Sequence, residues 1–333
     1  MDKTLSQAFD LLRFPLAVLV VFLHIDNAPS IAVLHYDWSW NDGRWLYELT
    51  IVAVNIVAKI AVPCFFFISG YLFFYKNKIF TVEAYKDKIK RRIRSLLIPY
   101  VIWNILAVAY LYVTQDIVPD SLAGIFIAPA NFPLWFLRDL IIIVVFSPII
   151  YGIVRYAKLV GLLAMTVLYV SNLIPVLVVC LFSSVYFFYL GSYCSQNGFV
   201  ELVRRDGRPL YIATGALLAA SFVLYGQGVY DYVLAIFLIV GTLCSIKIGY
   251  ELVENGAKLL PVLTASSFFI YVSHKLGATY IAKLLFKAMP DNYYVLTLRF
   301  FVAPFLAVLI CIAVFAVWQK CSPKTLSFVT GRK

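Results

Sequence analysis

The chain has 333 residues, of which 63% are hydrophobic and 14% charged, and its formal net charge is +11. Because a soluble globular protein needs about a quarter of its residues charged to cover its surface, this composition excludes that class. The sequence instead predicts an all-α, polytopic integral membrane protein. Its positive charge is expected to reflect orientation in the membrane and contact with membrane lipids, and it gives no reason to expect a nucleic-acid partner.

Runs of about 20 apolar residues predict about ten transmembrane helices within a single domain, residues 1–333. Placing the amino terminus inside the cell puts 20 of the 28 basic residues on the cytoplasmic side, so both termini are predicted to be cytoplasmic. The longest predicted outer loops are 26–44 and 116–133, and the basic segment 76–94 is predicted to be cytoplasmic. The predicted spans are 8–25, 46–75, 95–115, 134–154, 159–175, 176–195, 209–226, 230–248, 262–284 and 294–319.

The first span carries ionisable side chains that hydrocarbon disfavours. Between Leu11 and Leu23 every residue except Arg13 is apolar, Asp10 lies one turn before Arg13, and His24 follows eleven residues after it. Eleven residues are about three helical turns, so Arg13 and His24 point to the same side, about 16 Å apart along the axis. Unless it has a partner or water, an arginine in hydrocarbon costs several kcal/mol, so we expect pairing with Asp10 and a polar path. Snorkelling of Arg13 to the interface is the competing explanation.

The basic segment 76–94 is predicted to form a short interfacial helix that runs into the third span. Attraction to an anionic inner leaflet, together with the orientation signal, is sufficient to explain its eight basic residues. A second interpretation is that Arg91, Arg92 and Arg94 hold the phosphates of a nucleotide-bearing donor, since guanidinium groups bind phosphate bidentately.

Several spans contribute ionisable residues at one depth. Counting about 1.5 Å per residue from the predicted boundaries places His24, Lys59, Arg138 and Arg299 at about 20 to 25 Å above the cytoplasmic edge, and His274 at about 18 to 20 Å. This layer predicts one wet cavity in the outer half of the membrane. For a single member such as Lys59, snorkelling explains the position equally well.

The cysteines argue against a metal site or a disulfide framework, and the first apolar run argues against a cleavable signal peptide. The six cysteines are scattered, mostly within apolar runs, and form no Cys-x-x-Cys pair. They predict packing roles, and we expect neither a metal site nor a disulfide framework. No small-residue cleavage site follows the first apolar run, so it is expected to remain as a span.

Four stretches occur in a characteristic order along nearly the whole chain. They are the Arg13-to-His24 spacing, FFFISGYLFF at 65–74, LWFLRDL at 134–140 and SFFIYVSHKL at 267–276. Together they resemble the bacterial acyltransferase-3 family of integral membrane O-acyltransferases, and Arg91-x-x-Arg94 is similar to that family's cytoplasmic arginine motif. The chain resembles the stand-alone members, which carry no added periplasmic domain.

The resemblance implies transfer of an acyl group, usually acetyl and sometimes succinyl, from cytoplasmic acyl-CoA to a hydroxyl of a surface glycan or lipid-linked sugar on the outer side. It implies a multi-pass protein of the bacterial cytoplasmic (inner) membrane, with acetyl-CoA as the expected donor substrate. The exopolysaccharide biosynthesis machinery is then an expected partner.

This reaction assigns roles to the polar residues. We expect His24 to act as general base on the acceptor hydroxyl, because neutral imidazole titrates near physiological pH, with direct acylation of His24 as the second possibility. Arg13, held by Asp10, would orient the donor. Packing remains an alternative role for the aromatic residues. The other expected site residues are Ser69, Gly70, Tyr71, Arg91, Arg92 and Arg94 for the donor, and Lys59, Trp135, Arg138, Asp139, Tyr271, His274 and Arg299 for the acceptor or the oxyanion.

A transporter or flippase for a glycan or lipid is the main alternative, since it also needs a polar cavity between spans. Transporters commonly consist of two related halves, and the pairing of Arg13 and His24 has no counterpart in the sixth span. A membrane glycosyltransferase is a weaker alternative, because no Asp-x-Asp or paired carboxylate site occurs at the membrane. A receptor would need binding alone and no base.

Overall fold

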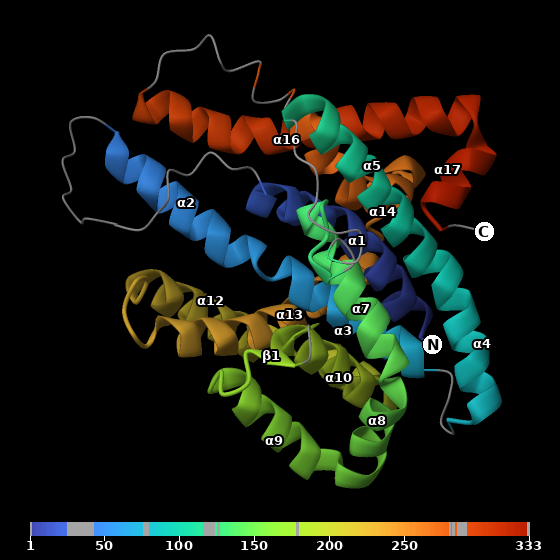
Figure 1. Cartoon of the computed structure of the whole chain (residues 1–333). Helices are drawn as coiled ribbons and strands as arrows, with labels where there is room; N and C mark the ends of the chain where they lie inside the picture. Colours follow the sequence, from blue (N-terminus) through green and yellow to red (C-terminus); the bar gives the residue numbers. More distant parts are fainter. Residues whose placement is uncertain are drawn as a thin grey trace.

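The computed structural model describes residues 2–24, 43–75, 80–115, 124, 127–177, 180–279, 281, 284 and 292–331. Residues 26–42 and 116–123 of the two predicted outer loops lie outside the described residues. The described chain is a bundle of helices, and both termini lie at the same end of it (Figure 1). We call this the terminal end. An ion pair of 2.8 Å between Asp2 and Arg204 belongs to it, as does the carboxyl-terminal helix.

The helices follow the apolar runs of the sequence. In chain order they are α1 (Lys3–His24), α2 (Arg44–Ala58), α3 (Ala61–Phe74), α4 (Val82–Arg92), η1 (Ile93–Leu97), α5 (Ile98–Gln115), η2 (Phe132–Leu134), α7 (Trp135–Val145), α8 (Ser147–Gly152), η3 (Ile153–Ala157), α9 (Lys158–Val170), α10 (Phe182–Gln196), α11 (Phe199–Arg204), α12 (Arg208–Val223), α13 (Tyr230–Glu254), α14 (Pro261–Ser273), η4 (His274–Ala278), α16 (Tyr293–Cys321) and α17 (Pro323–Val329).

Six helical stretches in the described part of the chain are long and apolar enough to cross a membrane, which confirms the prediction of a helical, multi-pass membrane protein. The count of ten spans and the cytoplasmic position of both termini remain predictions. The stretches are Lys3–His24, Arg44–Phe74, Val82–Val113, Ser147–Val170, Tyr230–Glu254 and Tyr293–Cys321, and Arg208–Val223 is a shorter apolar helix.

The predicted second span, 46–75, is two helices rather than one. Helix α2 ends at Ala58, Lys59 and Ile60 form a turn, and α3 begins at Ala61. Pro63 explains the position of the break, because its ring excludes the carbonyl four residues earlier, that of Lys59, from a regular helix. The helix is therefore interrupted within the predicted span, although Arg44–Phe74 as a whole is long and apolar enough to cross a membrane.

The predicted interfacial helix is α4, and it continues into the third span through one π-helical turn. The Thr81 hydroxyl caps α4 by accepting a hydrogen bond from the Ala84 amide at 3.2 Å. The π-helical turn, Ile93–Leu97, ends two residues before Pro99, which cannot donate the amide hydrogen bond of a regular helix. The basic residues of α4 are thereby joined rigidly to α5.

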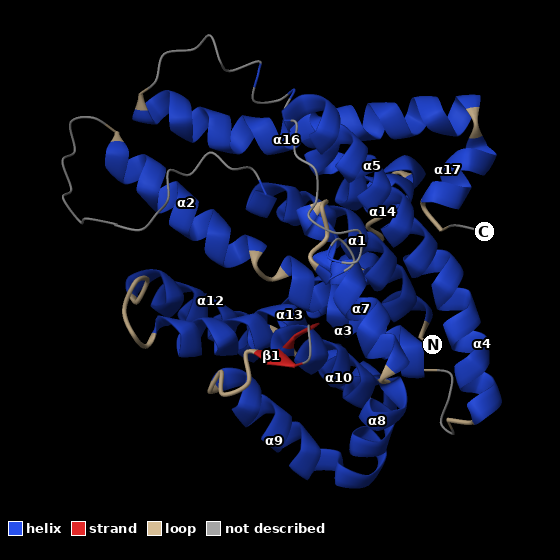
Figure 2. Cartoon of the chain, in the orientation of Figure 1, coloured by secondary structure: helices blue, strands red, loops and turns tan. Residues whose placement is uncertain are grey.

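The predicted sixth span, 176–195, begins later than the sequence suggested. Strands β1 (Val176–Leu177) and β2 (Cys180–Leu181) pair antiparallel with Val176 opposite Leu181, and α10 begins only at Phe182. They are the only strands in the described chain (Figure 2). Pro175 lacks an amide hydrogen, and the valine-rich run after it favours extended backbone, so the helix starts after the hairpin.

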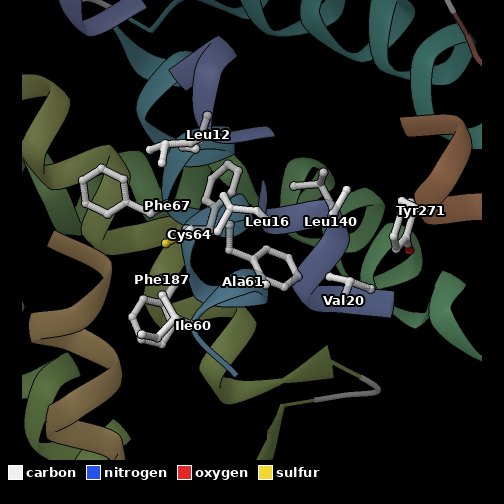
Figure 3. Packing of buried hydrophobic residues seen from close by; sticks show 14 of the residues in the cluster. Leu12, Leu16, Val20, Ile60, Ala61, Cys64, Phe67, Leu140, Phe187 and Tyr271 are labelled. Carbon is white, nitrogen blue, oxygen red and sulfur yellow. The ribbon is translucent and has the colours of Figure 1, made fainter. Parts of the chain in front are cut away.

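The core forms where α3 crosses α10 and where α1 packs against α3, α13 and α14. A Cβ atom on Gly70 would lie 2.0 Å from the Phe188 carbonyl oxygen, and one on Gly191 would lie 2.0 Å from that of Phe67. The two glycines therefore allow the backbones of α3 and α10 to touch. Leu16 and Val20 of α1 belong to the same buried cluster (Figure 3).

The outer faces of the bundle are apolar and exposed. On α9, Val160 is 75% exposed, Val167 62% and Leu163 58%. Such a surface suits contact with lipid and would be a liability in water.

Candidate active site

Helix α1 carries the predicted ion pair. The Nη1 atom of Arg13 lies 3.0 Å from Oδ1 of Asp10, three residues earlier. Both side chains remain about half exposed, at 44% and 52%. The predicted pairing is therefore confirmed, and the guanidinium still has access to a ligand.

Arg13 lines a cavity of about 290 Å³ between α1, α3, α4, α7 and α14. Its polar lining consists mainly of Arg13, Ser69, Arg92, Ser267 and the Tyr271 side chain, and the remainder is largely apolar. We call it the arginine cavity. Its lining residues are Arg13, Phe65, Ile68, Ser69, Leu72, Arg92, Leu96, Phe136, Leu137, Leu140, Thr264, Ser267, Phe268, Tyr271 and Thr330.

One face of α3 lines the arginine cavity. Of the three predicted donor residues on this helix, only one lies on that face. Ser69 is on the cavity face with its neighbours one turn away. Gly70 points to the contact with α10. The Tyr71 ring is buried against Phe9, with ring centroids 5.3 Å apart. Gly70 and Tyr71 thus have packing roles, and only Ser69 of this group faces the cavity.

The three arginines of α4 and η1 also differ in whether they line the arginine cavity. Arg92 lines the arginine cavity and is partly buried, whereas Arg91 and Arg94 are exposed. The Nε atom of Arg91 donates a hydrogen bond to the Asp87 carbonyl at 3.2 Å. Because successive residues of a helix differ by about 100° in direction, three nearby arginines cannot all face one cavity.

A second, smaller cavity of about 190 Å³ adjoins the first at the terminal end. Asp10, Gln7 and Lys258 contribute to its lining, and Thr264 lines both cavities. The ion pair of Asp10 and Arg13 therefore lies between the two spaces, with one partner lining each.

Further along α1, the structure places two histidines side by side. The ring centroids of His24 and His274 are 5.3 Å apart, and the ring planes meet at 62°. His274 is fully buried where α14 passes into the π-helical turn η4. Nδ1 of His24 lies 2.7 Å from the Val20 carbonyl oxygen, so it is the nitrogen that carries hydrogen in the neutral ring.

Phe132 covers the histidine pair on the side of η2. Its ring is 59% exposed, and its centroid lies 5.8 Å from that of His24. The Nζ atom of Lys275 lies 5.5 Å from the same ring. The segment is fixed because the Asn131 side-chain amide donates to the Val272 carbonyl at 2.8 Å, and the Tyr271 hydroxyl donates to the Pro133 carbonyl at 2.6 Å.

Aromatic rings form the end of the arginine cavity nearest the histidines. Tyr271 and Phe136 meet edge to face with centroids 5.6 Å apart, and Phe268 lies 6.1 Å from Tyr271. All three line the cavity, whereas His274 follows Tyr271 by one turn of the same helix. Tyr271 is therefore the lining residue that is nearest to His274 along the chain.

The members of the predicted ionisable layer have different neighbours in the described part of the chain, and the single wet cavity remains a prediction. The Lys59 Nζ atom lies 5.7 Å from the Tyr230 ring centroid, at the start of α13. The Nη2 atom of Arg138 forms an ion pair of 2.7 Å with Asp139, which is fully buried. His24 and His274 are the two members that the structure brings into contact.

Asp139, Trp135 and Arg299, the remaining predicted site residues, take part in packing or in hydrogen bonds between helices. Oδ2 of Asp139 accepts hydrogen bonds from the Ser184 hydroxyl at 2.9 Å and the Leu181 amide at 3.1 Å. It thereby ties α7 to the start of α10. Trp135, the first residue of α7, packs partly buried against the core. Arg299 lies partly buried on α16, which packs against α14, α2 and α1.

Several residues of the site were missed in the sequence. Ser267 begins the SFFIYVSHKL stretch and Thr264 lies three residues before it, but no sequence pattern distinguished either residue from the core. Thr330 reaches the arginine cavity because α17 folds back onto α5, where the Trp103 indole donates to the Val329 carbonyl at 2.9 Å. The exposure of Phe132 depends on a loop conformation that no sequence pattern indicated.

Comparison with known proteins identifies the family of the chain. The model of the acyltransferase-3 family, described as an acyltransferase domain, matches residues 6–317. The chain is 28% identical to the succinoglycan biosynthesis protein ExoH of Rhizobium meliloti (strain 1021) over 364 aligned positions, which cover 100% of this chain and 94% of the relative. No solved structure matches. Since the family model covers nearly all of it, the chain belongs to the acyltransferase-3 family, membrane enzymes that transfer acyl groups other than aminoacyl groups.

Proposed function

We propose that this enzyme moves an acetyl group from acetyl-CoA, bound from the cytoplasmic side, to a hydroxyl of an exopolysaccharide or its lipid-linked precursor on the outer side of the bacterial inner membrane. Membership of the acyltransferase-3 family supports the reaction class. Similarity to a protein named for succinoglycan biosynthesis supports a polysaccharide acceptor. The basic residues concentrated near the terminal end support the cytoplasmic assignment of that end.

The arginine cavity fits the donor. A coenzyme A thioester joins an anionic head to a long, thin arm that ends in the acyl group. Arg92 and Arg13 offer guanidinium groups to the anionic part, and the apolar lining suits the arm. Arg91 and Arg94 are exposed within two residues of Arg92 in the sequence. The volume of about 290 Å³ suits the arm rather than the whole molecule, so the nucleotide would remain outside.

The histidine pair fits the proton transfer. Because the Val20 carbonyl holds the hydrogen on Nδ1 of His24, its basic nitrogen is Nε2. His24 Nε2 would take the proton of the acceptor hydroxyl as the oxygen attacks the thioester carbonyl, and would return it to the departing thiolate. The exposed ring of Phe132 offers a sugar a surface beside this base.

One observation carries the proposal: two helices connect the cavity with the histidine pair. On α1, Arg13 lines the cavity and His24 lies three turns further on; on α14, Tyr271 lines the cavity and His274 follows one turn later. A donor that enters beside Arg13 would reach His24 by passing the aromatic ring of Tyr271. A binding site for the donor and a base for the acceptor are thus aligned along one path.

The proposal is tested with purified protein in liposomes. Radiolabelled acetyl-CoA is supplied with polysaccharide from cells that lack the protein, and mass spectrometry locates the label. Transfer of the label to a hydroxyl of the polysaccharide is the expected result. Movement of a lipid-linked glycan across the membrane without any transfer of label would overturn the proposal and favour a flippase.

A further inference from the structure

The imidazole of His274 has one nitrogen that forms no hydrogen bond within the described part of the chain. The side chain is 0% exposed, and Nδ1 lies 3.0 Å from the Ile270 carbonyl oxygen and 2.9 Å from that of Tyr271. Nδ1 must therefore carry the hydrogen, which leaves Nε2 as an acceptor. Nε2 is buried and has no hydrogen-bond partner among the residues that the structure describes. A buried acceptor without a partner lowers stability, and a catalytic role is one reason for a protein to retain it.

The ring that faces His274 is His24. Their rings meet nearly edge to face, with centroids 5.3 Å apart. In both residues Nδ1 is directed to a backbone carbonyl of its own helix, so both have the same tautomer. A neutral imidazole with hydrogen on Nδ1 is a dipole whose negative end is Nε2. In His274 this dipole is fixed by two carbonyls on α14, beside the ring that becomes charged.

We propose that His274 is a positioning residue whose buried Nε2 stabilises the positive charge that His24 acquires during acyl transfer. This inference rests on the proposed function. As the acceptor O–H bond breaks, the proton moves to Nε2 of His24 and a bond forms between the oxygen and the thioester carbonyl carbon. When the carbon–sulfur bond breaks, the proton passes to the thiolate and yields free coenzyme A.

Nε2 of His274 stabilises His24 only while the His24 ring carries the proton of the acceptor. While His24 is neutral, the lone pair of His274 has no charge to stabilise, so it does not strengthen substrate binding. An interaction that appears only on the way to the transition state raises kcat and leaves KM unchanged. A preorganised dipole on a fully buried side chain is effective because it needs no reorientation.

The test compares His274→Leu, which removes the dipole, with His274→Gln, whose side-chain oxygen restores an acceptor near Nε2. We expect His274→Leu to lower kcat about 10- to 100-fold, the effect of losing a charge-assisted interaction, with KM for both substrates unchanged. His274→Gln should recover most of this loss. The thermal midpoint of His274→Leu should not fall, since the substitution removes an unsatisfied buried acceptor.

A double-mutant cycle with His24 completes the test. If His274 acts through His24, adding His274→Leu to His24→Ala should cause no further loss. Additive losses, a raised KM for the polysaccharide, or equal losses in the Leu and Gln variants with lowered thermal midpoints would overturn the inference. Wild-type protein that transfers no acyl group would defeat the proposed function instead, whereas active wild type with fully active His274→Leu would defeat only the inference.

Discussion

The two ends of α1 offer opposite surroundings to their ionisable residues. Arg13 and Asp10 pair at 3.0 Å while remaining 44% and 52% exposed beside open cavities. His24 packs against a fully buried histidine, and each ring is oriented by a backbone carbonyl of its own helix. A permanent charge thus keeps a partner and access to solvent, whereas the partly buried His24 ring packs against the rings of His274 and Phe132.

This contrast suggests a division of labour along one helix. An exposed guanidinium can hold an anionic substrate because water offsets the cost of keeping the charge in the membrane. An imidazole that packs against a fully buried ring such as His274 responds more strongly to nearby dipoles than one in bulk water, since electrostatic interactions strengthen as burial increases. The terminal end would therefore bind the donor, and the histidine pair would carry out the proton transfer.

The largest effect is expected from His24→Ala. Loss of a general base should lower the rate of acyl transfer about 10²- to 10⁴-fold, while the affinity for acetyl-CoA remains nearly that of the wild type. Transfer of radiolabel and calorimetric titration with acetyl-CoA measure the two quantities. A variant that retains more than a few per cent of wild-type transfer would remove His24 from the role of base.

Arg92→Ala should show the opposite pattern. Removal of a charge-assisted contact worth about 1.5 to 3 kcal/mol should weaken binding of acetyl-CoA about 10- to 100-fold. The exposed Arg91→Ala, Arg94→Ala pair should lose less per residue because solvent screens those charges. Lys86→Ala, an exposed basic residue on the same helix, is the matched control and should bind normally. If the Arg91→Ala, Arg94→Ala pair loses as much acetyl-CoA affinity per residue as Arg92→Ala, the phosphates bind on the outer surface of α4 and not in the cavity.

Gly70→Ala separates packing from donor binding. A Cβ atom 2.0 Å from the Phe188 carbonyl would force α3 and α10 apart, so the variant should lose about 1 to 3 kcal/mol of stability. Gly152→Ala is the control, because a Cβ atom there meets nothing within 4 Å. Thermal unfolding in detergent measures both. A Gly70→Ala protein with normal stability but weakened donor binding would return Gly70 to the donor site.

Ser69→Ala should have the smallest effect. A neutral hydrogen bond contributes about 0.5 to 1.5 kcal/mol, so KM for acetyl-CoA should rise about 2- to 10-fold, with kcat unchanged. Ser195→Ala is the control, since the Ser195 hydroxyl is bonded to the Ser192 carbonyl at 2.7 Å on a helix that does not line the cavity. A fall in kcat without a change in KM would place Ser69 beside the reacting atoms instead.

The sequence by itself determined the membrane class, the approximate course of most helices and the ion pair of Asp10 with Arg13. Those features depend on local regularities: the length of apolar runs and the spacing of residues along one helix. Pro63 and Pro99 show where local rules were present but overlooked, because each proline breaks or alters a helix that the apolar pattern had drawn as continuous. The family resemblance likewise rested on short, local motifs.

Only the tertiary structure decided which residues meet across helices. Hydrophobicity alone does not orient α3, because it is apolar on all sides, so its pattern could not tell that Ser69 faces the cavity and Gly70 faces α10. Similarly, counting depth placed His24, His274 and Lys59 near one level but could not determine the rotation of their helices. Side-chain direction changes by about 100° per residue, so residues at one depth meet only when helix rotation and the break at Lys59 allow it.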